Sequence, residues 1–123
     1  MTKAERRDAN WAALWKDGYN EGMYALEAAT PAPMTVVNSM TGQRWHESEG
    51  ACGFAWVVIR PGGSSFARWL KKHDHASNHY HGGVSVWVRA GGQSVDRKTA
   101  FATAMARVFQ EAGIRAVAGS RLD

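Results

Sequence analysis

Apolar residues near the N-terminus recur at the three- and four-residue spacing of a helix, at Trp11, Leu14, Trp15, Tyr19, Met23 and Leu26. Thr2, followed three residues later by Glu5, fits the capping-box pattern of a helix start. We therefore predict a helix over residues 3–29. Gly18 and Gly22 each lower helix stability by about 1 kcal/mol relative to alanine, so a break near Asp17–Gly18 is an alternative to one continuous helix. The prolines within residues 30–33 end the helix.

Alternating and continuous apolar runs predict strands farther along the chain. Residues 52–60 are apolar at both alternating sets of positions, which predicts a central strand covered on both faces. Val84, Val86 and Val88 alternate with other residues, a pattern typical of a half-buried strand over 84–89. We also expect short strands over 34–40 and 114–118, and a polar loop or irregular hairpin over 41–50.

Serine caps predict two further helices. Ser64 or Ser65 precedes a segment that runs to about His73 and carries Phe66, Trp69 and Leu70 on its inner side. Ser94 precedes residues 95–112, whose apolar stripe ends before Gly113; the stripe consists of Phe101, Ala104, Met105, Val108 and Phe109. This last helix has the strongest pattern of the three.

These elements predict a single domain over residues 1–123. Residues 1–33 form an N-terminal helix and proline linker, and residues 34–123 form the core. The fold class is α+β or small α/β, with a β-α-β-α-β unit and a sheet of three or four strands against which the helices pack. We expect a tight right-handed crossover from strand 84–89 through helix 95–112 to strand 114–118.

Composition indicates a soluble globular domain. Of the 123 residues, 45% are hydrophobic and 21% charged, and the longest apolar run is far too short for a bilayer span. The N-terminus lacks the apolar segment of a secretory signal, so we expect a cytoplasmic protein without a membrane partner. The net charge of +4 favours anionic partners, although ordinary solubility explains the same value. Six tryptophans suit a small core, with one or two left as binding surfaces.

One internal repeat carries candidate chemistry. The segments 59–65 and 88–94 share an apolar residue, arginine, a small residue, two glycines, one variable position and serine. Each follows a predicted strand and precedes a predicted helix, where free backbone N–H groups attract anions. If the two strands are parallel neighbours, both turns open at one edge of the sheet. The predicted anion site then comprises Arg60, Gly62, Gly63, Ser64, Ser65, Arg89, Gly91, Gly92, Ser94 and Arg121.

Ordinary turn and cap chemistry accounts for the same residues, with glycine in the turn, serine as cap and arginine in solvent. Neither standard nucleotide-binding fingerprint is present, and we expect no bound cofactor.

A histidine-rich loop over residues 73–81 offers a second candidate site. Imidazole is a good ligand for zinc, nickel or copper, and the candidate ligands are His73, His75, His79 and His81. A solvated loop without metal is the alternative interpretation. Cys52 opens an apolar strand, where a buried and unreactive thiol is the common case. We therefore assign no catalytic residue, and an enzyme is the less favoured interpretation.

The runs over residues 50–57, 59–62 and 64–70, together with Gly82–Val84, Trp87 and the ending 118–123, resemble a family of small uncharacterised bacteriophage proteins. The resemblance covers residues 50–123 and carries no established activity. It implies work in the bacterial cytoplasm, as a host-takeover, anti-defence or accessory factor.

Three functions remain open. The favoured one is a non-enzymatic accessory protein that engages a host protein or an anionic ligand through a basic, aromatic surface. The second is a nucleotide or nucleic-acid binder that uses the repeated turns, with Trp87 beside Arg89 adding stacking and charge on one sheet face. The third is a small metal-dependent enzyme that uses the histidine loop. An exposed edge strand would permit a homodimer.

Overall fold

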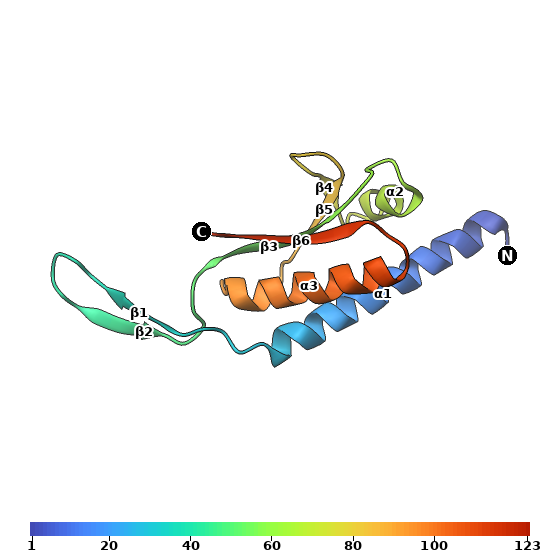
Figure 1. Ribbon diagram of the computed structural model, residues 1–123. Coiled ribbons are helices and arrows are strands. Elements are labelled where there is room, and N and C mark those ends of the chain that lie inside the picture. Colours follow the sequence, from blue (N-terminus) through green and yellow to red (C-terminus); the bar gives the residue numbers. More distant parts are fainter.

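The computed structural model describes residues 1–123 and contains three helices and six strands (Figure 1). The class is α+β, one of the two predicted alternatives. The helices are α1 (Lys3–Ala28), α2 (Ser65–Lys72) and α3 (Val95–Glu111). The strands are β1 (Met34–Val37), β2 (Arg44–Glu47), β3 (Gly53–Ile59), β4 (Ser77–Asn78), β5 (Val84–Trp87) and β6 (Ala116–Leu122). No helix combines the length and hydropathy that a bilayer crossing requires.

The main sheet has four strands in the order β4-β5-β3-β6, and every neighbouring pair is antiparallel. The expected central position of the strand over 52–60 is confirmed, since β5 and β6 flank β3. β5 and β6 both run against β3 and therefore run the same way as each other. The connection through α3 consequently passes over β3 instead of joining adjacent strands. From β3 to β6 the chain follows the split β-α-β-β-α-β arrangement.

Helix α1 follows the predicted span closely, and the alternative with a break near Asp17–Gly18 is wrong. Both hydrogen bonds of the capping box between Thr2 and Glu5 form, and the helix continues through both glycines. A Cβ atom at Gly18 would lie 2.6 Å from Cε1 of Phe109, and one at Gly22 would lie 2.9 Å from ring atoms of Phe101. The two glycines therefore let α1 pack closely against α3 without breaking the helix.

Serine caps hold the other two helices as predicted. The hydroxyl of Ser64 accepts a hydrogen bond from the Ala67 N–H, and that of Ser94 accepts one from the Arg97 N–H. Gly113 follows α3 at φ +85°, the left-handed geometry with which glycine ends helices.

The hydrophobic core lies on one face of the main sheet. Ala55, Val57 and Ile59 of β3 share one buried cluster with side chains from all three helices, including Leu26, Phe66 and Phe109. α1 and α3 lie on the same side of β3 and β6 in Figure 1. The opposite face carries no helix.

This one-sided arrangement corrects the expectation that β3 is covered on both faces. Val58 is buried, but Phe54 and Trp56, on the helix-free face, are only half-buried.

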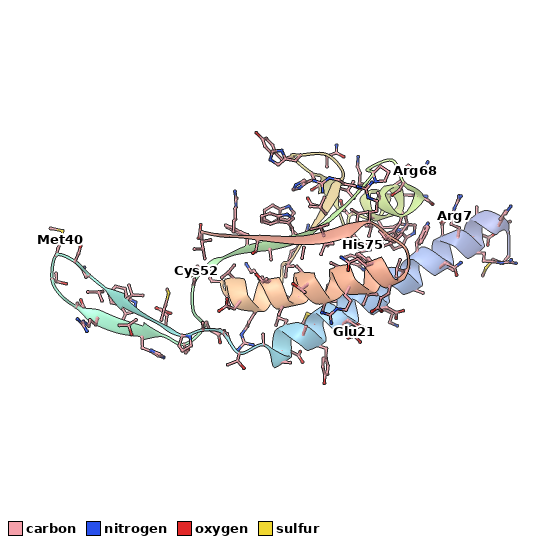
Figure 2. The ribbon with its side chains drawn as sticks, in the orientation of Figure 1. Arg7, Glu21, Met40, Cys52, Arg68 and His75 are labelled. Carbon is pink, nitrogen blue, oxygen red and sulfur yellow. The ribbon has the colours of Figure 1, made fainter.

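β1 and β2 form a separate two-stranded hairpin that stands away from the body, and we call residues 34–47 the arm (Figure 1). The short strand expected within 34–40 is present as β1. Residues 41–50, expected as a loop or irregular hairpin, instead supply the tip of the arm and its return strand β2. Met40 lies at the tip of the arm (Figure 2) and is 94% exposed. The base is tied to α3, because Asp96 Oδ2 accepts a hydrogen bond of 2.8 Å from the Ala32 N–H.

Candidate functional site

The two repeated turns lie at opposite ends of the sheet, so the expectation of parallel neighbours is wrong. Ile59 pairs with Val84 at one end, next to Arg60, whereas Val88, next to Arg89, bonds to Ala55 near the other end. An antiparallel pair separates turns that parallel neighbours would bring together. The predicted residues therefore divide into two groups. The first is Arg60, Gly62, Gly63, Ser64 and Ser65; the second is Arg89, Gly91, Gly92 and Ser94, with Arg121 at the same end.

In the second turn, Ser94 already makes structural hydrogen bonds, and acidic residues lie nearby. Ser94 caps α3 and also donates its hydroxyl hydrogen to the carbonyl of Glu49. The residues that line the hollow beside Gly91 and Gly92 include Glu47 and Glu49, whose negative charges disfavour an anion. Arg97, the nearest guanidinium there, is already paired with Glu49 at 2.6 Å.

At the first turn, Arg60 lies near His79. Burial lowers the pKa of that imidazole, and the charge of Arg60 lowers it further.

The histidines form separate contacts instead of one cluster. The ring centroids of His73 and His75 are 6.4 Å apart, and those of His79 and His81 are 6.1 Å apart. His75 stacks on Trp15 of α1 at 4.1 Å between centroids. No group of three or more His, Cys, Asp or Glu side chains gathers in a metal-binding arrangement.

Cys52 is exposed, which corrects the expected buried thiol. It lies where the chain leaves the arm and enters β3 (Figure 2). The strand becomes buried only from Gly53 onward.

Three aromatic side chains gather on the helix-free face of the sheet, and we call them the aromatic platform. They are Phe54 and Trp56 from β3 and Trp87 from β5. The Trp56 and Trp87 ring centroids are 5.1 Å apart, and those of Phe54 and Trp87 are 6.0 Å apart. Trp56 and Trp87 are register partners, so their side chains emerge on the same face. Trp87 is 40% exposed.

Two cations border the platform at Phe54. The guanidinium carbon of Arg121 lies 5.4 Å from the centroid of that ring, and Nζ of Lys98 lies 5.5 Å from it. Both distances fit cation–π contacts. Lys98 is buried and donates a hydrogen bond to the Gly53 carbonyl, whereas Arg121 is exposed and free to reach a ligand.

Gly119 of β6 makes room for the platform. A Cβ atom there would lie 2.6 Å from Nε1 of Trp56, so only glycine lets the indole lie flat across the neighbouring strand.

The sequence pattern predicted Trp87 on a sheet face beside Arg89, but Phe54 and Trp56 were not predicted as binding residues. The available signal was that both large aromatics of β3 occupy the same set of alternating positions. That pattern fits a buried strand equally well, so only the placement of the helices shows that this face is open.

The aromatic platform and its arginine thus form a surface that can stack planar groups and attract anions. Comparison of the chain with models of protein families, with curated proteins and with solved structures finds no match.

Proposed function

We propose that the protein binds single-stranded nucleic acid on the aromatic platform. The observation that carries the proposal is the position of Phe54, Trp56 and Trp87 on the two central strands of a four-stranded sheet whose helices all lie on the other face. RNA-recognition domains stack two or three bases on aromatic side chains of a four-stranded sheet in this manner. Because fold alone does not imply function, these three side chains, and not the fold, support the proposal.

Charge supports the same ligand. Arg121 over Phe54 supplies a cation next to a stacking ring, and the whole chain carries a net charge of +4. Base stacking needs no particular sequence, because every base has a π-face, and arginine adds cation–π and phosphate contacts. This version of nucleic-acid binding uses the sheet face and does not need the repeated turns to converge.

The test is the binding of a fluorescein-labelled oligonucleotide of about 12 nucleotides, measured by fluorescence anisotropy. Oligouridine and oligothymidine compare RNA with DNA. Trp87→Ala should weaken binding by about 1–3 kcal/mol, the usual value of one stacked base. The control is Trp45→Ala, because Trp45 on the arm is 44% exposed and Trp87 is 40% exposed.

Equal loss in both tryptophan variants, or binding that Trp87→Ala leaves unchanged, would contradict the proposal. So would the absence of oligonucleotide binding by the wild-type protein.

A second candidate function, engagement of a host protein, is favoured by the arm. An isolated two-stranded hairpin is only marginally stable in water, and this one exposes Met34, Val37 and Trp45. A partner that nuclease-treated wild-type protein retains, but that a chain without the arm loses, would support this function. Retention of the partner by the armless chain would contradict it.

A further inference from the structure

A cavity of about 340 Å³ lies beneath the outer edge of β5, and we call it the edge cavity. β4 pairs only with Val84 and Ser85, so no strand covers β5 from Val86 onward. The loop at Asp74 and His75 borders the opening. The volume falls at the lower end of the range for small-molecule sites.

Aromatic side chains make up much of the cavity wall. Trp15 and Tyr19 come from α1 and Phe101 comes from α3, with the rings of Tyr19 and Phe101 5.3 Å apart and nearly perpendicular. His75, marked in Figure 2, stacks on Trp15. Burial and the nearby His73 lower the pKa of His75, against a smaller opposing effect of Asp74, and the lowered pKa favours the neutral imidazole. These walls suit a flat, uncharged heterocycle.

Two charged residues that form no salt bridge, Asp74 and Arg89, are also among the residues that line the edge cavity. The only salt bridge in the protein joins Arg97 to Glu49. A carboxylate accepts hydrogen bonds and donates none, so Asp74 selects a ring edge that presents N–H groups. Arg89 complements an acceptor atom or a phosphate.

Trp87 belongs to both the aromatic platform and the edge cavity. Trp87 therefore lies at the border between the platform and the cavity, on the edge of β5 that no strand covers. Bases splayed from a single strand are commonly read by stacking and by hydrogen bonds to their edges. Among the four RNA bases, guanine presents two adjacent N–H donors, N1–H and N2–H, on its Watson–Crick edge.

We infer that the edge cavity takes one guanine of the bound strand and that the Asp74 carboxylate accepts hydrogen bonds from its N1–H and N2–H. The inference rests on the proposed nucleic-acid function and adds base selectivity to it. Adenine and uracil place an acceptor where guanine places a donor, so Asp74 disfavours both.

The experiment compares three labelled RNA strands of about 12 nucleotides: oligouridine, the same strand with one central guanosine, and the same strand with inosine there. Wild-type protein should bind the guanosine strand about 5- to 100-fold more tightly than oligouridine, the usual discrimination of a bidentate pair. Inosine keeps N1–H and lacks the amino group, so its affinity should lie between the two.

Asp74→Asn is the test variant, because Asp74 has φ 65° and asparagine tolerates that left-handed geometry. The variant should lose the preference for guanosine and keep the affinity for oligouridine. Glu21→Gln is the matched control, since it removes one negative charge from the exposed side of α1 (Figure 2).

Failure of all three strands to bind would overturn the proposed function itself. Equal binding of the three strands by wild-type protein, or a guanosine preference that survives Asp74→Asn, would overturn the guanine site and leave the platform proposal standing.

Discussion

At the scale of single residues, Arg97 of α3 connects the end of α1 with the base of the arm. Its Nη1 donates hydrogen bonds to the carbonyls of Leu26 and Ala29 at the end of α1, at 3.1 and 3.3 Å. Its Nε donates to Glu49 at the base of the arm, at 2.6 Å. One guanidinium near the start of α3 thus holds two other segments in place: the last turn of α1 and the segment that follows the arm.

The ion pair between Arg97 and Glu49 predicts that the unfolding free energy of the protein depends on pH. The hydrogen bond from Arg97 is the main cause that lowers the pKa of Glu49 from its ordinary value of 4.5. A lowered carboxyl pKa stabilises the folded state above the ordinary value, and that contribution is lost as the pH falls through the native value. Glu49→Gln should therefore lower the urea midpoint at neutral pH, with the difference from wild type vanishing in acid.

A double-mutant cycle checks the origin of this effect. Glu49→Gln should have no pH-dependent effect on stability once Arg97 is replaced by methionine. An undiminished effect in that background would show that Glu49 acts through another group. Arg97→Met alone should destabilise the protein more than Glu49→Gln, because it also removes two bonds to α1 carbonyls.

At the scale of elements, the contact between α1 and α3 depends on small residues. A Cβ atom at position 22 would meet three ring carbons of Phe101 at 2.9 Å, and Phe101 is only 2% exposed. Overpacking of a core costs about 1–3 kcal/mol, while the better helix propensity of alanine returns about 1 kcal/mol. The net effect of Gly22→Ala should thus be a loss of up to about 2 kcal/mol of unfolding free energy.

Chemical denaturation measures this loss, with Asn20→Ala as the control on an exposed position of the same helix. The control should be neutral or slightly stabilising. A Gly22→Ala protein as stable as the control would mean that α1 and α3 have room to separate.

Local patterns predicted the elements well because their signals lie within a few residues of each other. The caps at Thr2, Ser64 and Ser94 each use a hydrogen bond to a residue three positions on. The break that Gly18 suggested is absent, because Gly18 makes room for the ring of Phe109 on α3. No pattern within α1 encodes that contact.

The direction in which neighbouring strands pair was harder to predict from the sequence than the elements themselves. The two similar turns at Arg60 and Arg89 suggested parallel neighbours, whereas the short hairpin through β4 reverses the chain before β5 begins. β4 pairs through only two residues and gives little sequence signal. The candidate anion site depended on that direction. The aromatic platform depends on which face of the sheet the helices cover, and no local pattern in the strands encodes that.

At the scale of the whole molecule, the arm and the body are separate structural units. The arm's strands pair only with each other, and hydrogen bonds of Ala32 and Glu49 tie its base to α3. Replacing residues 34–47 with a short Gly-Ser-Gly linker should leave the unfolding free energy and the oligonucleotide affinity within experimental error of wild type.

Denaturation and anisotropy titrations test this prediction. A short linker suffices because Met34 and Glu47 are register partners, so the two ends that it joins lie close together. A marked loss of stability would indicate that the arm folds back on the body. A loss of affinity alone would indicate that the arm contributes to the nucleic-acid surface.

The placement of all three helices on one side of the sheet gives the folded protein a two-layered form. A bound strand on the other side would act as a third layer, made of bases instead of side chains. Unfolding scatters Phe54, Trp56 and Trp87, so such a strand has affinity for the folded chain only and shifts the folding equilibrium toward it. At a free concentration of 100 times Kd this shift amounts to about 2.7 kcal/mol. The melting temperature of the protein would then rise with the amount of nucleic acid in the sample.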